Sequence, residues 1–587
     1  MSQPIIDQHY PSQWADTHQV VNQPTPLENY NVFNSDLTLQ HWLKVFAGGW
    51  GYSRCQAYGK AVGHELLRAG FLANKYKPEF NSHDRFGRRI DQVDYHQAYH
   101  QLMTVAVESG YHQLPWQQPI EGANVVRAAM GYLHTQADPG TGCPLTMTFA
   151  AVPTLRKQPD LVNDWLPKVL ADQYDPENKP YFTKAGVTIG MAMTEKQGGS
   201  DVRANTTTAT PIAQSGPGKA YELVGHKWFC SAPMSDAFLV LAQAKGGLSC
   251  FLMPRWRPDG IKNQLFIQRL KNKMGNVSNA SSEIEFRGAL AWLVGEEGQG
   301  VPNIIEMVAL TRFDCIIGSA ALMRQAAAQA LHHAAERQVF GKVLQQQPLM
   351  QNVLADLAVE SEAAIALGMR VASSLDNQDQ EQQQLFLRLA TAVGKYWVCK
   401  RTVQHSYEAM ETIGGVAVVE DNILPRLYRE APVNAIWEGS GNIQCLDVLR
   451  AINKQPAILD VYFQEIKAVR GSDQYLDHLS LQLEQIAVKL GQFSSTEVQW
   501  QSRQLVEKLA LALQASILIN YGEPVIAEAF IAGRLVPNSG YQYGTLPTHI
   551  NAQAVIDRAT PQLSTSGDNK EKYTHGLSAH NNDFGAF

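Results

Sequence analysis

One carboxylate in this sequence lies in a segment suited to proton transfer. Glu438 stands between Trp437 and Gly439 in the run IWEGSGN, residues 436–442. An indole ring beside the carboxylate would exclude water and raise its pKa toward the range of a general base. The glycine would leave a backbone N–H free to bond a substrate oxygen. Taken alone, however, the segment favours a solvated glutamate in a loop.

Two further segments carry groups that suit a planar polar ligand. The run MAMTEKQGGSD, residues 191–201, leads from an apolar strand into a loop whose paired glycines let backbone N–H groups approach such a ligand closely. A tight β-turn would explain these glycines equally well. The run GHKWFCS, residues 225–231, places aromatic rings beside small polar groups on a strand and could flank a flavin ring. By composition alone, ordinary strand packing is favoured for this run.

Helical and strand patterns follow one another in an uncommon order along the chain. Residues 1–40 are polar and interrupted by proline, which predicts an extended arm outside the core. Residues 41–185 have apolar side chains at three- and four-residue spacing and are predicted to form a helical domain. Short runs rich in β-branched or aromatic residues, separated by turn signals, predict antiparallel strands in a small β domain over 186–295.

Helical patterns return after the predicted β domain. Three long periodic segments with a polar connector at 377–384 predict an antiparallel bundle over 296–455. An additional helical domain is predicted over 456–560, and a flexible tail over 561–587. The predicted fold is therefore mainly α with a central β domain: an N-terminal helical domain, a small antiparallel β-barrel or sandwich, a C-terminal helical bundle and an extra C-terminal helical domain.

Composition excludes several classes of protein. The 587 residues carry a net charge of -6, which gives no general attraction for nucleic acid or anionic membranes. The seven cysteines are scattered without a C-x-x-C pair, so we expect free thiols and no metal site. The first residues do not resemble a signal peptide, and no apolar run reaches the ~20 residues of a membrane span. We therefore expect a cytoplasmic protein without a membrane association.

Six short motifs, in this order and at these separations, resemble those of the acyl-CoA dehydrogenase flavoproteins. The resemblance covers about residues 140–450. The motifs that carry it are TEKQGGSD at 194–201, GHKWF at 225–229, Thr311-Arg312, RQVFG at 337–341, Ile413-Gly414-Gly415 and WEGS at 437–440.

The resemblance implies an FAD-dependent acyl-CoA dehydrogenase. Glu438 would be the catalytic base that removes the α-proton of an acyl-CoA while the β-hydride passes to the flavin. Ser200, Arg312 and Gly439 are implied at the substrate. The residues implied to bind FAD are Met193, Thr194, Gly199, Ser200, Phe229, Ser231, Arg337, Phe340, Gln347, Gly414, Gly415, Ser440 and Asn442. Arg337 and Phe340 would reach FAD from a neighbouring subunit, which implies a homotetramer, and electron-transfer flavoprotein is the expected electron acceptor.

The chain departs from the family pattern at a few of these positions. Phe229 replaces a tryptophan that flanks the flavin, and Trp437 replaces a tyrosine before the base. Pro348 stands where the family has glutamine, with Gln347 one place earlier. We expect FAD binding to survive these changes and the acyl pocket to be remodelled or narrowed.

Two other functions compete with the dehydrogenase hypothesis. Segments such as PRLYRE, residues 425–430, resemble an alkylation-response branch of the family, which implies a DNA-binding flavoprotein with weak or vestigial dehydrogenase activity. Residues 460–560 are net acidic, whereas a surface that binds the phosphate backbone of DNA is expected to be basic, so the composition argues against DNA binding by this segment. The other hypothesis is a protein that binds or senses acyl-CoA without turnover.

Overall fold

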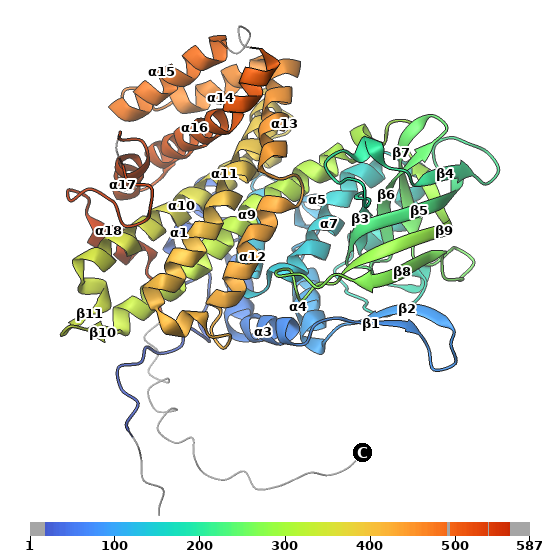
Figure 1. Cartoon of the computed structure of the whole chain (residues 1–587), viewed down its shortest axis with the longest axis horizontal. Coiled ribbons are helices and arrows are strands. Elements are labelled where there is room, and N and C mark those ends of the chain that lie inside the picture. The colour runs from blue at the N-terminus through green and yellow to red at the C-terminus, as the bar shows by residue number, and fades with distance from the viewer. Residues whose placement is uncertain (1–17, 490–493, 538, 564–587) are drawn as a thin grey trace, which may run out of the picture.

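The computed structural model describes residues 18–489, 494–537 and 539–563, and the predicted tail from 564 onward lies outside them. Along the chain, one group of helices precedes a β domain and another follows it, which confirms the predicted fold class; the β domain lies at one side of the molecule (Figure 1). The first group consists of α1 (Leu37–Ala47), α2 (Tyr52–Ala61), α3 (Leu67–Lys75), α4 (Gln97–Glu108), α5 (Leu114–Gln117), α6 (Ala123–Ala137), α7 (Pro139–Arg156) and α8 (Pro159–Val169).

The described part of the predicted arm, residues 18–40, differs from the prediction in one respect. Residues 18–36 have little regular structure before α1, but the side chains of Leu27, Tyr30, Val32 and Phe33 are buried in the hydrophobic core. The prediction that this arm stays outside the core is therefore wrong, because its few apolar residues anchor it. A second difference is a two-stranded hairpin, β1 (Glu79–His83) and β2 (Arg89–Asp94), between α3 and α4.

The β domain is a closed sheet. Its strands are β3 (Ile189–Ala192), β4 (Thr208–Pro211), β5 (Ala220–Ser231), β6 (Ala237–Ala244), β7 (Gly247–Pro254), β8 (Leu265–Leu270) and β9 (Ser281–Val294). The order β6-β4-β5-β9-β7 is closed by pairing between β6 and β7, so five strands form a barrel. The predicted strands β5, β6, β7 and β9 pair antiparallel, whereas β3 and β4 each pair parallel to β6.

The bundle is built from three long helices and two shorter ones. They are α9 (Gly300–Glu336), α10 (Pro348–Asp376), α11 (Glu381–Ile413), α12 (Leu424–Ile436) and α13 (Gly441–Lys454), with a small hairpin of β10 (Gln338–Val339) and β11 (Lys342–Val343) between α9 and α10. Proline at the first position of α10 suits a helix start, where its missing N–H is not needed.

The directions of these helices determine which residues lie at which end of the bundle. Cys399 and Thr402 of α11 contact Cys315 and Ser319 of α9 in the same order, so α9 and α11 run parallel. The short connections on either side of α10 make it antiparallel to both. The ends of α9 and α11 and the start of α10 therefore lie together, at the edge of the molecule farthest from the barrel in Figure 1.

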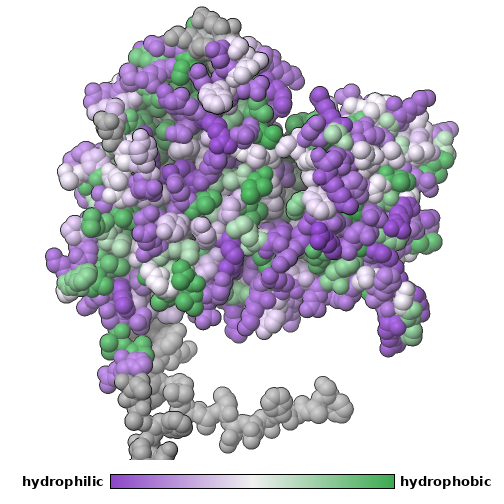
Figure 2. Space-filling model, viewed as in Figure 1, coloured by the Kyte–Doolittle hydropathy of each residue, from purple (hydrophilic) through white to green (hydrophobic). Residues whose placement is uncertain are grey.

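Additional helices cover one side of the bundle. They are α14 (Ala457–Lys467), α15 (Gln474–Lys489), α16 (Ser495–Tyr521), α17 (Pro524–Arg534) and α18 (Ala552–Ala559). A capping box between Ser494 and Glu497 fixes the start of α16. Polar side chains cover most of the face drawn in Figure 2, with apolar side chains in smaller patches. Within the described ranges, we find no helix with both the length and the apolar character needed to cross a bilayer.

Candidate active site

Glu438 occupies the turn that joins α12 to α13. Its backbone has φ of 57°, a left-handed conformation that residues other than glycine rarely adopt. The side chain keeps some contact with solvent, as does that of Trp437 before it. A strained, non-glycine residue between two helices is a common feature of functional sites, since the surrounding contacts must hold it there. The predicted base is thus presented on a fixed turn rather than on a flexible loop.

Thr311 of α9 contacts the carboxylate directly. Its Oγ1 lies 2.7 Å from Glu438 Oε2 and 3.0 Å from the Val308 carbonyl oxygen. A hydroxyl has only one proton to donate. When Glu438 is ionised, Thr311 donates to it; when Glu438 is protonated, the carboxyl donates to Thr311, which donates to Val308. The hydroxyl therefore accommodates both protonation states of the base.

The electrostatic surroundings of Glu438 favour its protonated form more than water does. Burial raises the pKa of Glu438 above its ordinary value, while the hydrogen bond from Thr311 and the positive charges of Lys395 and Arg312 offset part of that rise. A carboxylate with a raised pKa binds a proton more strongly than an exposed one and so is better suited to remove a weakly acidic proton.

Three side chains hold the carbonyl groups of the turn. Lys395 Nζ donates to the carbonyl oxygens of Trp437 and Gly439, both at 2.8 Å. Arg312 Nε donates to the carbonyl of Glu438 at 2.9 Å, and Gln444 Nε2 donates to the same oxygen at 3.1 Å. With these carbonyls engaged inside the protein, the turn cannot change its peptide orientations without losing several hydrogen bonds.

Arg312 is itself held by an ion pair. Its Nη1 lies 2.8 Å from Asp447 Oδ2 on α13, and Arg388 of α11 approaches the other oxygen of Asp447 at 2.7 Å. The hydrogen bonds and charges of these arginines outweigh the burial of Asp447 and keep its pKa below the ordinary value. Asp447 therefore stays ionised and fixes the guanidinium of Arg312 beside the turn.

A second group of predicted residues lies on the barrel. The loop after β3 carries Met193, Thr194, Gly199 and Ser200, and the Thr194 carbonyl accepts a hydrogen bond from the Trp228 N–H at 2.8 Å. This contact joins the loop to β5, which carries Phe229 and Ser231. The six residues predicted for the flavin ring therefore come from two neighbouring segments of the barrel.

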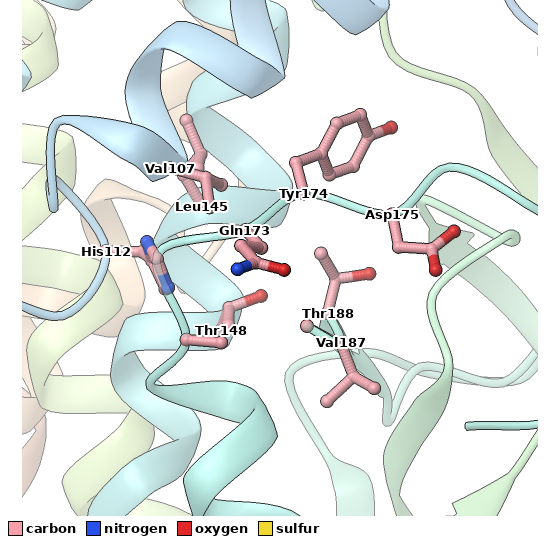
Figure 3. A pocket seen from close by; sticks show the side chains of 11 residues that line it. Val107, His112, Leu145, Thr148, Gln173, Tyr174, Asp175, Val187 and Thr188 are labelled. Carbon is pink, nitrogen blue, oxygen red and sulfur yellow. The ribbon is translucent and has the colours of Figure 1, made fainter. Parts of the chain in front are cut away.

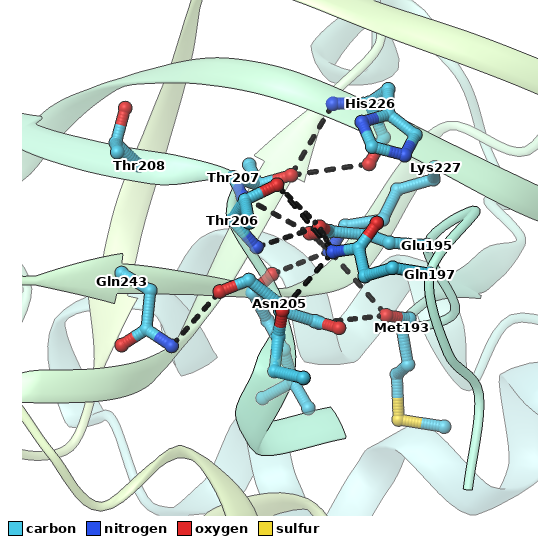
Figure 4. A network of polar contacts seen from close by, with 12 residues as sticks. Met193, Glu195, Gln197, Asn205, Thr206, Thr207, Thr208, His226, Lys227 and Gln243 are labelled. Atoms are coloured by element: carbon cyan, nitrogen blue, oxygen red, sulfur yellow. Dashed lines mark hydrogen bonds and ion pairs between the residues drawn. The ribbon is translucent and has the colours of Figure 1, made fainter. Parts of the chain in front are cut away.

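A buried ion pair anchors this loop (Figure 4). Glu195 Oε1 lies 2.8 Å from Lys227 Nζ, and neither side chain is exposed. Burial alone would raise the pKa of Glu195, but hydrogen bonds from Lys227 and Thr207 and the Lys227 charge outweigh it and lower that pKa to about 2. The backbone N–H groups of Thr206 and Thr207 also donate to this carboxylate. Glu195 thus fixes the loop while its neighbours Thr194 and Gly199 face outward.

The surface beside this loop fits a planar ring with a polar edge, as FAD has. Phe229 is 46% exposed, although it follows two largely buried positions of β5. The hydroxyls of Thr194 and Ser200 have no hydrogen-bond partner within the described part of the chain. A methyl group added to Gly199 would meet the Thr194 side chain at 3.1 Å, so the absence of a side chain keeps the backbone more open there. Exposed aromatic carbon, unpaired hydroxyls and open backbone together suit such a cofactor.

Cys143, near the start of α7, connects the two groups. Burial raises the pKa of Cys143 to about 12; the charge of Lys273 lowers it, that of Glu438 raises it further, and a hydrogen bond with Ser231 lowers it. The thiol of Cys143 is thus influenced by one residue of each group, Ser231 on the barrel and Glu438 beside the bundle.

The remaining predicted cofactor residues lie far from Glu438. Arg312 lies about 36 Å from the end of α9, because each residue of an α-helix adds 1.5 Å along its axis. Arg337 and Phe340 follow directly after that end, in and beside the small hairpin. Gln347 follows, with its Nε2 donating to the Val339 carbonyl at 3.0 Å. The other residues of this group, Gly414 and Gly415, lie at the end of α11. One chain does not bring this group and Glu438 to the same site.

Ser440 and Asn442 lie just beyond Glu438, at the start of α13. Ser440 is the N-cap of that helix, but its side chain does not cap it. Asn442 Oδ1 accepts a hydrogen bond of 2.9 Å from Arg503 Nε, which belongs to α16 of the additional helices. The extra C-terminal helices therefore touch the predicted cofactor residues directly.

Two cavities in the N-terminal half lie away from these residues. One of about 10 Å³, room for one water, lies among side chains of α4, α7 and the segment 173–188 (Figure 3). Burial lowers the pKa of His112 in its wall to about 4, so that imidazole is neutral. The other, of about 110 Å³, lies between Tyr95, Tyr99 and Met234. Neither contains a residue predicted for the site.

Several residues around Glu438 were missed at the level of sequence. Lys395, Gln444 and Asp447 contact the turn or its arginine but belong to no recognised motif. Lys395 offered one signal, because it is a single cation within the apolar stretch LATAVGKYWV of α11. Gln444 and Asp447 offered none, since polar residues at helical spacing are typical of any exposed face.

Comparisons with known proteins agree with this arrangement along most of the chain. Residues 22–176 match the family model of the adaptive response protein AidB N-terminal domain. Residues 190–289 match the acyl-CoA dehydrogenase middle domain, and residues 298–453 match the acyl-CoA dehydrogenase C-terminal domain.

Similar proteins cover nearly the full length. The putative acyl-CoA dehydrogenase AidB of Escherichia coli is 44% identical over 521 residues, which cover 88% of this chain and 94% of that protein. The acyl-CoA dehydrogenase family member 11 of Caenorhabditis elegans is 29% identical over 76% of this chain and 75% of its own length. The solved structure of ACDH-11 from C. elegans in complex with C11-CoA superposes with a TM-score of 0.80 at 25% identity, over 94% of both chains.

Proposed function

The chain belongs to the acyl-CoA dehydrogenase family and is similar to AidB within it, and from the geometry at Glu438 we propose that it dehydrogenates an acyl-CoA thioester between its α- and β-carbons. The observation that carries the proposal is a carboxylate of raised pKa that hydrogen-bonds Thr311 and stands on a turn whose carbonyls Lys395 and Arg312 engage.

Glu438 would act as the general base. Its ionised carboxylate removes the α-proton of the acyl group, and Thr311 then accepts a hydrogen bond from the protonated carboxyl. The electron pair left by the proton moves toward the thioester oxygen, where a backbone N–H of the turn can bind it. Arg312 and Gly439 would contact the substrate beside this oxygen, and Ser200 would contact it from the barrel loop.

The barrel loop and β5 would hold the ring system of FAD. When bound, FAD supplies the acceptor for the β-hydride. Phe229 would pack against the ring, while Met193, Thr194, Gly199, Ser200 and Ser231 would line its edge. Ser440 and Asn442 at the start of α13 would contact the remainder of the cofactor from the bundle, together with the N–H groups at that helix end.

Two copies of the chain would complete one cofactor site. Arg337, Phe340, Gln347, Gly414 and Gly415 lie at the far end of the bundle, beyond the reach of one dinucleotide bound beside Glu438. Phe340 is 97% exposed, which is unusual for a large apolar side chain unless a partner covers it. These features support a homotetramer in which each copy gives its far end to a neighbour's site.

The substrate and the electron acceptor follow from the relatives. The ACDH-11 structure holds C11-CoA, and an acyl-CoA is the substrate proposed for this chain. Electron-transfer flavoprotein is the proposed acceptor. The cytoplasmic location stays a prediction, which cell fractionation would test.

Anaerobic bleaching of the flavin tests the proposal. Purified protein should carry FAD, and short, branched or long acyl-CoA thioesters should be offered in turn; at least one should remove the visible flavin absorbance. Glu438→Gln should keep the absorbance and slow bleaching by about 10⁴-fold, the upper range for loss of a general base. Glu430→Gln is the matched control, because Glu430 is also buried on α12 but contacts the Asn276 N–H instead. No bleaching with any thioester would refute the function.

DNA binding remains a second hypothesis, favoured by the similarity to AidB and to the adaptive-response family model. The basic residues of the additional helices give it little support, because several are engaged internally: Arg534 pairs with Asp356 at 2.6 Å, and Lys467 pairs with Glu484 at 2.9 Å. A mobility shift with duplex DNA that weakens with added salt would support this function. No shift at low salt would exclude it.

A further inference from the structure

Lys395 contacts the backbone of the turn that carries Glu438. Its side chain is 1% exposed, and its ammonium donates to the carbonyls of Asn434 at 3.0 Å and of Trp437 and Gly439 at 2.8 Å. An ammonium group has three protons, so these three acceptors use all of them. Burying a lysine is costly, and here two of its three hydrogen bonds are made to the catalytic turn and the third to the end of α12.

The orientation of one peptide unit follows from this contact. In a trans peptide the C=O and the N–H point in opposite directions, and the described residues contain no cis peptide. The Trp437 carbonyl shares its peptide unit with the Glu438 N–H. Because Lys395 holds that carbonyl, the N–H of Glu438 must point away from Lys395. Within the described ranges this N–H has no acceptor in the chain.

The next peptide unit is held in the same way, by hydrogen bonds to its carbonyl oxygen. Arg312 and Gln444 hold the Glu438 carbonyl, which shares its peptide unit with the Gly439 N–H. Both N–H groups are therefore oriented by buried or half-buried donors before any ligand arrives. Such preorganisation is what stabilises a developing negative charge, because no reorientation is needed at the moment of reaction.

We infer that Lys395 is a positioning residue that builds the oxyanion site, by aiming the Glu438 N–H at the thioester oxygen of bound acyl-CoA. The inference rests on the proposed function. As Glu438 takes the α-proton, the electron pair of the broken C–H bond moves into the thioester and places negative charge on its oxygen. The aligned N–H is needed at that stage and not for binding, so Lys395 affects kcat more than KM.

A substrate analogue isolates this step. An acyl-CoA with sulfur in place of the β-carbon can lose its α-proton but has no β-hydrogen to transfer. Exchange of that α-proton with deuterated solvent therefore reports on Glu438 and the oxyanion site without hydride transfer. We expect Lys395→Met to slow exchange by about 10²-fold, the usual effect of losing one oxyanion donor, with analogue affinity nearly unchanged.

The pH dependence separates positioning from a charge effect. The positive charge of Lys395 also lowers the pKa of Glu438, so Lys395→Met shifts the activity toward higher pH. If the slower exchange persists on the alkaline plateau, where Glu438 is ionised in both proteins, Lys395 acts by positioning. If the loss disappears there, the lysine acts only through its charge and the inference is overturned.

Two further variants serve as control and substitute. Arg370→Met removes a cation that is 7% exposed and pairs with Glu465 at 2.6 Å, away from the turn; it should exchange at the wild-type rate. If Lys395→Met does not fold, Gln444→Leu tests the same turn from its other side and should slow exchange by about tenfold; unchanged exchange would then overturn the inference. Wild-type exchange no faster than that of Glu438→Gln would instead refute the proposed function.

Discussion

The two ends of the α9–α11 bundle are built in opposite ways. At the end near the barrel, Glu438 is held by three buried or half-buried donors, and each carbonyl of its turn is engaged. At the far end, Phe340 and Gly414 face open space, and the side chain of Arg337 donates to the Asn22 carbonyl of the N-terminal arm.

The difference shows which part of the reaction one chain can complete. Proton removal needs groups fixed to within fractions of an ångström, and a single chain supplies them all around Glu438. Binding a long cofactor needs contact area, which the far end offers to another copy. In the proposed assembly, the near end would be complete in one subunit, whereas the far end would act at the site of a neighbouring copy.

Mixing two inactive variants tests this division and carries the largest expected effect. Glu438→Gln should be inactive because it lacks the base, and Arg337→Ala should lose bound FAD. If the two ends serve different sites, mixed assemblies contain some sites with both ends intact, and flavin bleaching should return from near zero. Co-expression of the two chains with different tags, followed by tandem purification, gives the sample.

A same-end pair provides the control for that experiment. Glu438→Gln mixed with Arg312→Ala leaves every site with one defect at the near end, so bleaching should be no faster than in Arg312→Ala alone. Recovery in this control, or none in the first mixture, would contradict the division between the two ends.

Arg312→Ala alone tests how much the fixed turn at the near end contributes to the reaction. It removes the donor to the Glu438 carbonyl and leaves Asp447 without one of its ion-pair partners. We expect flavin bleaching to slow by about 10²-fold, with FAD retained. Arg388→Ala is the matched variant, because Arg388 also pairs with Asp447 but does not contact the turn. Equal losses in both would assign the effect to Asp447 rather than to the turn.

Thr311→Val should have a smaller effect that depends on pH. The Thr311 hydrogen bond lowers the pKa of Glu438, so its loss raises that pKa further. The base works only when ionised, and activity is lost as pH falls through its pKa. The acid limb of the rate profile should therefore move to higher pH, with a loss of at most about tenfold on the plateau. Stopped-flow bleaching from pH 6 to 9 measures this, and an unchanged acid limb would count against Glu438 as the titrating group.

Phe340→Ser tests the far end and should change stability least. The ring is 97% exposed, so the free energy of unfolding should stay within about 0.5 kcal/mol of wild type in urea titrations. Light scattering after size exclusion should nevertheless show weaker assembly, and FAD should be lost on dilution. A stable tetramer that keeps its cofactor would argue that another surface joins the copies.

Much of the fold could be predicted because apolar spacing determines it. The run at 96–109 forms α4, and the run at 123–136 forms α6, as the helical spacing of their apolar residues predicts. The hairpin β1–β2 was missed, since its strands EFNSH and RIDQVD are polar and half exposed and lack a clear alternation. Parallel pairing of β3 and β4 to β6 depends on contacts between distant segments, which local patterns do not carry.

Only those residues of the candidate site that belong to family motifs could be predicted from the sequence. They named Glu438, Arg312 and Gly439, which the structure brings into contact. They could not indicate that Lys395 is buried, because a lysine is ordinarily expected at the surface. Nor could sequence order reveal that Gly414 lies far from Ser440, since that separation depends on the direction in which α11 runs.

The contact between Arg503 and Asn442 has a practical consequence for anyone who shortens this protein. Helix α16 looks dispensable, because the family motifs end before it begins. A fragment that stops at residue 455 would nonetheless remove the hydrogen bond from Arg503 to Asn442 and expose the apolar flank of α13. A minimal catalyst should therefore retain the chain at least through Tyr521.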